Sequence, residues 1–284
     1  MSLKNKIKMS LLKINQYFNR LDGQAYVSYS GGKDSTVLLH MVKRLYPDVE
    51  IVYVNTGLEY PEINYQVSLQ DNVTIIRPKR NFSEVLDRWG YPVISKEVSK
   101  NISRYRNTKH EWVRQYRKYG IKRDGSKGKA GVIPKKWWAM IDAPFKISDM
   151  CCYQLKINPI KKYEKLSGLK PVIGTMVTDS LRRKFNYLKY GCNVFGVKNI
   201  SSRPLSFWTE KDIWNYIRKF KVNYCSIYDK GESNTGCIFC LFGIHLEKEP
   251  NRLQRMRLLH PKLYSYCIDN LGIGEVLDYM EIPY

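Results

Sequence analysis

The segment Ser-Gly-Gly-Lys-Asp-Ser at residues 30–35 constrains the fold of this chain more than any other stretch. It follows the apolar residues 25–29 and precedes the apolar residues 36–42, a pattern that predicts a strand, a tight glycine loop and a helix. Two consecutive glycines let the backbone turn where a Cβ would clash. The N–H groups at the start of a helix form an anion site, to which Lys33 adds a positive charge. We therefore expect this loop to bind a phosphate or pyrophosphate group.

This loop is not a Walker A motif. That motif requires a glycine five residues before the Gly-Lys pair and Ser or Thr after the lysine, whereas Val27 and Asp34 occupy these positions. A plain glycine turn between strand and helix is the alternative. The combination of strand, glycines, lysine and helix favours the phosphate site.

Alternating strand and helix patterns predict the fold class. Strand-like runs lie at residues 49–54, 73–76, 171–174 and 193–195, with helical patterns at 62–70, 82–89, 159–166 and 180–190. This alternation predicts an α/β, Rossmann-like parallel sheet with helices on both faces, plus a small, mostly helical C-terminal region containing cysteines. We expect an α/β domain over residues 1–200 and a C-terminal region over residues 201–284 packed on it. Ligands in such sheets bind beyond the carboxyl ends of the strands.

The chain is strongly basic, with 48 Lys or Arg residues against 26 Asp or Glu and a net charge of +22. Residues 100–136 interrupt the α/β pattern and contain thirteen Lys or Arg residues but only two acids, a net +11. Aromatic residues alternate with these charges, and residues 122–131 resemble a flexible loop. The pattern is typical of a segment that binds nucleic acid. A solvated insertion whose aromatic residues pack on the core explains it almost equally well.

No apolar run is long enough to cross a membrane, and the basic residues 1–21 lack the apolar core of a secretory signal. Their apolar residues instead recur at helical spacing, which predicts an amphipathic helix packed on the sheet rather than one on a membrane surface. We expect a cytoplasmic protein with no membrane partner.

Seven cysteines, an odd number with two close pairs, indicate metal or redox chemistry rather than disulfides. Cys151 and Cys152 are adjacent, and Cys237 and Cys240 form a C-x-x-C pair. Four thiolates from two distant pairs can bind zinc or an iron–sulfur cluster. Buried reduced thiols are the third interpretation.

Several of these segments resemble one known family. The loop at residues 30–35 is similar to the PP-loop of the ATP pyrophosphatase superfamily, in the branch of the phosphoadenosine-phosphosulfate (PAPS) reductases. Residues 55–62 resemble the family's Asp-Thr-Gly turn, with Asn55 in place of the acid, and residues 174–183 resemble its Gly-x-Arg-x-x-Glu-Ser-x-x-Arg motif, with Met176 in place of the first arginine. Residues 203–231 are similar to the segment before the C-x-x-C pair.

The resemblance implies roles for particular residues. It implies that Lys33, Asp34 and Arg183 act in catalysis. It implies an adenine-nucleotide site, for ATP or for adenosine phosphosulfate (APS) or PAPS with Mg²⁺, formed by Ser30, Gly31, Gly32, Lys33, Asp34, Ser35, Asn55, Thr56, Gly57, Gly174, Asp179, Ser180 and Arg182. The tandem cysteines with a distant C-x-x-C pair resemble the cluster signature of APS reductases. This implies a [4Fe–4S] cluster on Cys151, Cys152, Cys237 and Cys240, with zinc as the alternative.

One departure from the reductase pattern affects the expected reaction. APS and PAPS reductases carry a nucleophilic cysteine in a Glu-Cys-Gly motif near the C-terminus, whereas the last cysteine here, Cys267, has no such neighbours. Reduction therefore lacks its expected nucleophile.

We accordingly predict an enzyme, a PP-loop adenylyl and sulfur transferase that activates a substrate by adenylylation and transfers sulfur to nucleic acid. Residues 100–136 would contact that nucleic acid, and a sulfur-donor protein would be a further partner. The alternatives are an APS or PAPS reductase that uses Cys267 or a thiol from another molecule, and a non-catalytic nucleic-acid-binding regulator.

Overall fold

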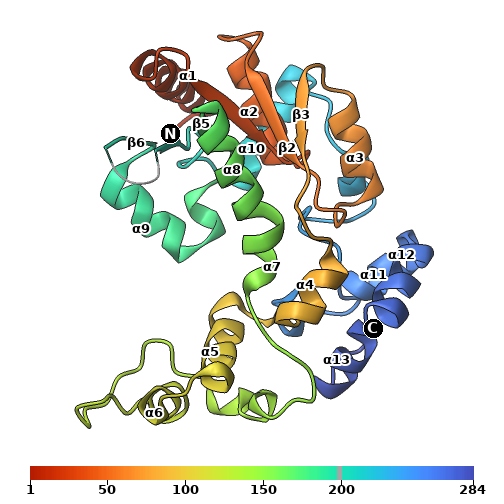
Figure 1. Ribbon diagram of the computed structural model, residues 1–284. Coiled ribbons are helices and arrows are strands. Elements are labelled where there is room, and N and C mark those ends of the chain that lie inside the picture. Colours follow the sequence, from red (N-terminus) through yellow and green to blue (C-terminus); the bar gives the residue numbers. More distant parts are fainter. Residues whose placement is uncertain (197–199) are drawn as a thin grey trace. The chain divides into compact units, whose positions relative to one another are not determined.

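The computed structural model describes residues 1–196 and 200–284, and the chain divides into two compact units (Figure 1). Unit 1 comprises Met1–Asn55, Glu59–Arg77 and Pro159–Thr235, and unit 2 comprises Thr56–Leu58, Pro78–Asn158 and Gly236–Tyr284. Each unit is thus assembled from segments that alternate along the sequence. The boundary expected near residue 200 stays a prediction, because a compact unit is not by itself a domain that folds alone.

Unit 1 contains a sheet of six strands. Their order is β3 (Val73–Ile76), β2 (Glu50–Val54), β1 (Ala25–Tyr29), β5 (Lys170–Ile173), β7 (Ser201–Ser202) and β6 (Asn193–Val194). All neighbours are parallel except β6 and β7, which are antiparallel. The α/β prediction is confirmed, and the antiparallel edge corrects the expectation of a wholly parallel sheet. Too few residues separate β6 from β7 for the crossover that a parallel pair requires.

The central strand β1 has helices on both of its faces. Tyr26 donates a hydrogen bond to Glu164 of α8 (Asn158–Ser167) at 3.0 Å, and the Tyr29 hydroxyl lies 3.4 Å from that of Thr36 in α2 (Lys33–Lys43). Because successive side chains of a strand point to opposite faces, Tyr26 and Tyr29 place α8 and α2 on opposite sides of the sheet.

The N-terminal residues form the predicted amphipathic helix, α1 (Leu3–Arg20). It buries Ile7, Ile14 and Phe18, and the Ser2 hydroxyl accepts the Asn5 N–H at its start. This burial confirms the core interpretation of the helical spacing. The remaining helices of unit 1 are α3 (Pro61–Ser68), α9 (Leu181–Tyr190) and α10 (Glu210–Phe220), with 3-10 helices at Val177–Asp179 and Ser226–Tyr228.

Unit 2 is mostly helical. Its helices are α4 (Phe82–Trp89), α5 (Lys96–Asn107), α6 (Glu111–Tyr119), α7 (Met150–Cys152), α11 (Arg252–Leu259), α12 (Pro261–Ser265) and α13 (Ile273–Tyr279), with 3-10 helices at Lys135–Trp137, Ala139–Ile141 and Ile244–Leu246 and π-helices at Tyr153–Ile157 and Tyr266–Asn270. Two short parallel strands, β4 (Val93–Ile94) and β8 (Leu241–Phe242), join the segment before α5 to the cysteine region of residues 236–284. The sequence analysis did not predict this pairing, because each strand is only two residues long.

Hydrogen bonds order the segment after α6, where we expected a flexible loop over residues 122–131. Lys122 N–H donates to the Ser126 carbonyl at 2.8 Å, Gly128 N–H to the Gly120 carbonyl at 2.8 Å, and the Tyr116 hydroxyl to the Ala130 carbonyl at 2.7 Å. The segment is therefore a closed turn held against α6 rather than an open linker. Across the described residues, no helix has both the length and the apolar character that a membrane span requires.

Candidate functional site

The glycine loop lies where β1 ends and α2 begins. Gly31 has a φ of +72°, and a Cβ there would lie 2.9 Å from Cγ2 of Ile63, so both the conformation and the space require glycine. The Ser35 hydroxyl holds the turn closed, donating to the Gly32 carbonyl at 2.9 Å and accepting the Ser30 N–H at 3.1 Å. The predicted strand, loop and helix are all present.

The loop also lies at the point where the strand order reverses. The chain runs from β1 outward to β2 and β3, and then returns to β5 on the other side of β1. The carboxyl end of β1 is thus the topological switch point, which is where open α/β sheets bind ligands. Gly174, directly after β5, reaches the same place, because a Cβ on it would lie 2.9 Å from the Asp34 carbonyl oxygen.

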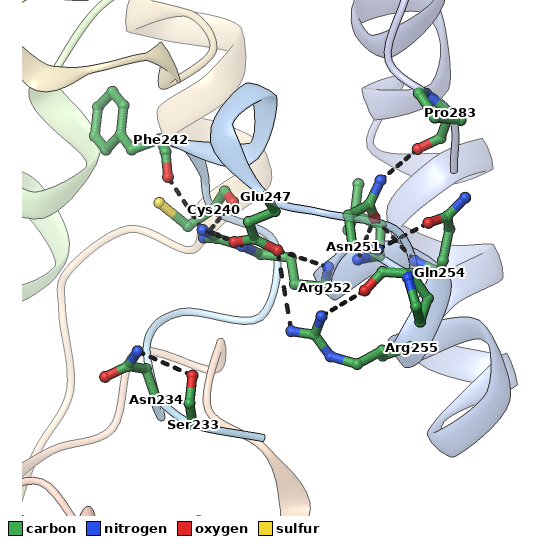
Figure 2. Close-up of polar contacts among 12 residues, drawn as sticks. Ser233, Asn234, Cys240, Phe242, Glu247, Asn251, Arg252, Gln254, Arg255 and Pro283 are labelled. Carbon is green, nitrogen blue, oxygen red and sulfur yellow. Dashed lines mark hydrogen bonds and ion pairs between the residues drawn. The ribbon is translucent and has the colours of Figure 1, made fainter. Parts of the chain in front are cut away.

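Lys33 is buried and engaged by residues about two hundred positions later in the sequence. Its Nζ donates to the Ser233 carbonyl at 2.8 Å, lies 3.2 Å from Glu210 Oε1 and sits 4.9 Å from the centre of the Tyr228 ring. Its backbone N–H donates to the Tyr228 hydroxyl at 2.9 Å. A second contact fixes the Ser233 segment, since the Asn234 side-chain amide donates to the Ser233 hydroxyl (Figure 2). The Nζ and the backbone N–H of Lys33, two donors that an anion would use, are therefore hydrogen-bonded to other parts of the protein.

Asp34 follows Lys33 and carries a buried carboxylate oxygen, Oδ1, with no hydrogen-bond partner among the described residues. Burial raises the pKa of this carboxyl to about 6, although the charge of Lys33 opposes the shift. A buried carboxylate oxygen without a donor is costly unless a cation or proton accompanies it. Asp34 thus fits the chemistry of a cation ligand.

The segment after β5 brings further predicted residues into unit 1. Asp179 accepts the Met176 N–H at 2.9 Å and forms an ion pair with Arg183, while the Ser180 hydroxyl accepts the Arg183 N–H at 3.3 Å at the start of α9. Asp179 and Ser180 therefore shape the backbone and hold Arg183. Met176, which replaces the family arginine, is 4% exposed and packs as a core residue.

A small cavity of about 20 Å³ lies beside this segment, and Arg183 and Arg203 are among its lining residues. It is lined by Thr175, Met176, Val177, Arg183, Asn186, Tyr187, Gly191, Arg203 and Ser206. Burial, and then the charge of Arg183, lower the pKa of Arg203. Arg182 is not among the lining residues. Arg203 begins the segment of residues 203–231 that resembles the family, but an arginine before a proline has no signature that would have assigned it to this site.

The turn at residues 55–57 lies partly in each unit. Asn55, at the end of β2, donates its N–H to the Ile76 carbonyl at 2.9 Å within unit 1. Thr56 and Gly57 belong to unit 2, where the Thr56 hydroxyl accepts the Leu58 N–H at 3.3 Å. The predicted participation of Asn55, Thr56 and Gly57 in a nucleotide site stays a prediction.

The four predicted ligand cysteines line a single cavity in unit 2. This cavity is small, with a volume of about 20 Å³, and is lined by Leu58, Phe82, Pro92, Cys151, Cys152, Leu155, Lys156, Cys237 and Cys240. None of the four cysteines is in a disulfide bond among the described residues. Within residues 1–196 and 200–284, no group of three or more His, Cys, Asp or Glu side chains is arranged to hold a metal ion. The structure thus brings both pairs to one cavity, while a metal at this place stays a prediction.

The charges around the cavity favour a thiolate at Cys152. A hydrogen bond from Cys151 lowers the pKa of Cys152, and Lys96 and Lys156 act in the same direction. Cys151 and Cys152 lie in α7, which continues into the π-helix at Tyr153–Ile157. Cys192, Cys225 and Cys267 are each at most 5% exposed, as expected for core residues.

Arg252 fixes the chain beside Cys240 (Figure 2). Its guanidinium donates to the Cys240 carbonyl at 3.1 Å and to the Phe242 carbonyl at 3.3 Å, and it forms an ion pair with Glu247. At the start of the same helix, Asn251 donates to the Pro283 carbonyl at 2.6 Å. Arg252 therefore has a structural role in positioning the C-x-x-C segment.

Residues 24–241 match the family model of the phosphoadenosine phosphosulfate reductase domain. The chain belongs to this family. The match spans the glycine loop, the residue 174–183 segment and all four cavity cysteines, so the resemblance inferred from short motifs is confirmed.

Curated relatives of this PAPS reductase family member are distant. An adenosine 5′-phosphosulfate reductase of Geobacillus kaustophilus is 25% identical over 238 residues, covering 83% of this chain and 80% of that protein. An uncharacterized protein of Methanocaldococcus jannaschii is 23% identical over 273 residues, covering 93% of this chain but only 52% of that protein. The chain thus spans about half the length of the archaeal relative.

Among solved structures, the crystal structure of a phosphoadenylyl-sulfate reductase from Candida auris in a phosphate complex gives a TM-score of 0.47 at 15% identity. The match covers 83% of this chain and 91% of that one. A score and an identity this low do not assign an activity. The match to the family model therefore establishes the family of this chain, and its ligand and reaction belong to the proposal below.

Proposed function

We propose that this protein binds ATP at the glycine loop, adenylylates a substrate and then transfers sulfur, with nucleic acid as the acceptor. The observation that carries the nucleotide part is the pairing of Lys33 with Asp34 at the start of α2. A buried ammonium and a buried carboxylate oxygen without a partner follow a glycine turn at the switch point of the sheet. This combination supports a polyphosphate accompanied by a cation.

The polyphosphate would replace contacts that the protein makes to itself. Lys33 now interacts with the Ser233 carbonyl and with Glu210, a side chain that is 60% exposed. A phosphate oxygen is a stronger acceptor for an ammonium than a neutral carbonyl. The amide of Lys33 would similarly exchange the Tyr228 hydroxyl for a phosphate oxygen. Asp34 Oδ1 would be the protein ligand of a Mg²⁺ ion, and this ion would neutralise charge on the bound phosphates.

The reaction balances in two displacements. An oxygen of the acceptor attacks the α-phosphorus of ATP, the bond to the β-phosphate oxygen breaks, and pyrophosphate leaves. A sulfur nucleophile at the sulfide level then attacks the activated carbon, and AMP leaves with the former acceptor oxygen. Lys33 would stabilise the charge that develops on the departing pyrophosphate.

The two arginines that line the cavity beside residues 174–183 support a second anionic group in unit 1. Arg183 is already held by Asp179, so its position does not depend on the ligand. Arg203 supplies a positive charge to the cavity that Met176 lines, where the family motif has an arginine. A phosphate of the nucleotide or of the acceptor is the ligand that this pair fits.

The four cysteines of the unit 2 cavity are the residues that would hold a [4Fe–4S] cluster. Cys151, Cys152, Cys237 and Cys240 would supply four sulfur ligands, and Lys96 and Lys156 would offset negative charge at Cys152. Such a cluster would supply a binding point for sulfur. Zinc on the same four thiols is the competing occupant, and metal analysis distinguishes the two.

The basic segment supports the nucleic-acid acceptor. Trp112 is 46% exposed and Tyr119 is 50% exposed, so two aromatic rings of residues 100–136 remain available to stack on bases. Tyr116 and Trp138 instead bond to the Ala130 and Ile133 carbonyls and thereby hold the turn after α6. The segment therefore combines a structural framework with exposed rings.

Pyrophosphate release from ATP tests the nucleotide part. With Mg²⁺ and an RNA or DNA acceptor pool, the Lys33→Ala variant is expected to release pyrophosphate at least about a hundredfold more slowly, the loss typical of removing one charge-stabilising donor. Lys43→Ala, at the other end of α2, is the matched control and should retain the wild-type rate. Equal rates in both variants would contradict the proposal.

Reduction of APS or PAPS is the second candidate, because the Geobacillus relative carries that name. Cys267 is an unfavourable nucleophile, since it is fully buried and burial raises its pKa to about 12. A reductase would therefore need a thiol from another molecule. Release of sulfite from APS or PAPS in the presence of thioredoxin, without pyrophosphate formation from ATP, would favour this candidate over the first.

A further inference from the structure

A groove in unit 2 collects positive charge without matching acids. It is open to solvent, has a volume of about 440 Å³, and is lined by Ser103, Arg104, Asn107, Thr108, Val113 and Arg117. The first four residues come from the end of α5 and its cap, and the last two lie one turn apart on α6. Helices α5 and α6 pack against each other (Figure 1, yellow). The groove lies between them and takes residues from both.

The two arginines of the groove are held differently. Arg117 donates from Nη1 to the Gly131 carbonyl at 3.0 Å, and its buried Nε has no hydrogen-bond partner in the described part of the chain. Burial, and then the charge of Arg104, lower the pKa of Arg117, so the two guanidinium groups are close enough to repel each other. Arg104 is exposed and has no ion-pair partner among the described residues.

Nearby carboxylates do not neutralise this pair. Within residues 100–136, Glu111 lies 3.4 Å from Arg114 and accepts a hydrogen bond from Gln115, while Asp124 accepts the Ser126 hydroxyl and N–H. Glu97, an exposed residue in the first turn of α5, acts on Arg117 more weakly than Arg104 does. Two like charges beside an unpartnered donor favour an anion.

Not every basic side chain of the segment is available to a partner. Arg106 donates to the carbonyls of Met140, Ile141, Ala143 and Phe145 and is thereby a structural clamp. The total charge of the segment therefore overstates its binding capacity. Arg104 differs from Arg106 because its side chain is exposed and lines the groove together with Arg117.

We propose that the groove between α5 and α6 binds a backbone phosphate of single-stranded nucleic acid. Arg104 and Arg117 contact the phosphate, and the exposed ring of Trp112 on α6 stacks on an adjoining base. The proposal rests on the proposed function, because it assigns the contact that holds the nucleic-acid acceptor. A single strand suits the site since its bases are free to leave the stack.

Binding of a fluorescein-labelled single-stranded RNA of mixed sequence to the full chain tests this assignment. Anisotropy titrations over a range of salt concentrations give both the affinity and its salt dependence. The Arg104→Ala variant is expected to bind on the order of tenfold more weakly, with the slope of log K against log salt reduced by about 0.7 for one lost phosphate contact. Trp112→Ala is expected to lose on the order of tenfold in affinity with an unchanged slope.

Arg123→Ala is the matched control. Arg123 is an exposed arginine in the same segment, outside the groove, so its loss changes the net charge equally and should reduce the affinity less than twofold. Arg104→Lys keeps the charge and should restore the slope but only part of the affinity. The exposure of Arg104 predicts an unchanged thermal unfolding midpoint, which separates lost binding from lost folding.

Two adverse outcomes are distinguishable. Equal weakening in Arg104→Ala and Arg123→Ala, with tight binding by the wild-type chain, would overturn the groove assignment while leaving the nucleic-acid acceptor intact. Failure of the wild-type chain to bind the RNA or the matching single-stranded DNA would overturn both the groove and the acceptor. Pyrophosphate release from ATP would still report on the glycine loop independently.

Discussion

The glycine loop of unit 1 and the cysteine cavity of unit 2 gather reactive groups in different ways. At the loop, the protein supplies internal partners, because Lys33 contacts Ser233, Glu210 and Tyr228, whereas Asp34 Oδ1 is buried with no partner among the described residues. At the cavity, four thiols line one small space of about 20 Å³. A ligand at the loop must therefore exchange existing contacts, whereas a metal group at the cavity would bind the thiols directly.

This difference predicts which site tolerates change. Removing one of the residues that contact Lys33 leaves its other contacts in place, so the affinity of the loop for a phosphate ligand should change only partly. Removing one thiol from a four-ligand set should lower the occupancy strongly, since one coordination position then loses its protein ligand.

The largest expected effect is loss of the cluster. Cys240→Ser, purified without oxygen, should lose most of the bound iron and the visible absorbance of the wild-type chain, while Lys33→Ala should retain both. Cys192→Ala removes a buried cysteine outside the cavity and should leave the iron content unchanged. Stoichiometric zinc in the wild-type chain, or full iron in Cys240→Ser, would show that the cluster assignment is wrong.

The next effect concerns the stability of the loop with no ligand bound. Because the pKa of Asp34 is raised from 3.8 to about 6, the folded state binds its proton more tightly than the unfolded state does. The stability contributed by protonated Asp34 is complete below pH 3.8 and is lost as the pH rises through 6. The loss is on the order of 3 kcal/mol for a shift of about two pKa units.

Asp34→Asn should remove this dependence. We expect its free energy of unfolding at pH 7.5 to exceed that of the wild-type chain by roughly 1–3 kcal/mol, while pyrophosphate release falls. Chemical denaturation at a series of pH values measures the difference, with the exposed Asp22→Asn as the control. A lower stability of Asp34→Asn at pH 7.5 would mean that Asp34 has an internal partner and is not poised for a cation.

The smallest expected effect comes from the Tyr228 hydroxyl. Tyr228→Phe frees the Lys33 N–H at the cost of about 1 kcal/mol of stability in the ligand-free chain. Since a bound phosphate no longer has to displace that hydroxyl, the affinity for ATP should rise about two- to fivefold. Isothermal titration measures this directly. A lower ATP affinity would instead indicate that Tyr228 contacts the nucleotide. It would contradict the idea that the Tyr228 hydroxyl competes with a phosphate for the Lys33 N–H.

Local sequence accounts for much of unit 1. Runs of apolar residues bounded by turn-forming residues predict strands β1, β2 and β3. Helix α4 begins and ends at the predicted residues, 82 and 89. The tight turn at Gly31 is predictable because glycine readily adopts the positive φ that the turn requires. The edge pair β6–β7 and the pair β4–β8 are each two residues long, too short for any periodicity to appear.

The candidate site divides in the same way. The sequence determined the anion loop, the number and spacing of the cysteines and the excess of positive charge, because each depends on residue types within a few positions of one another. The sequence also predicted that the two cysteine pairs meet, and the structure brings them to one cavity. Only the tertiary structure decided that residues 226–235 cover Lys33, that Arg203 joins Arg183, and that Arg106 is structural while Arg104 is exposed. Those relations depend on packing between distant segments, which local residue preferences do not specify.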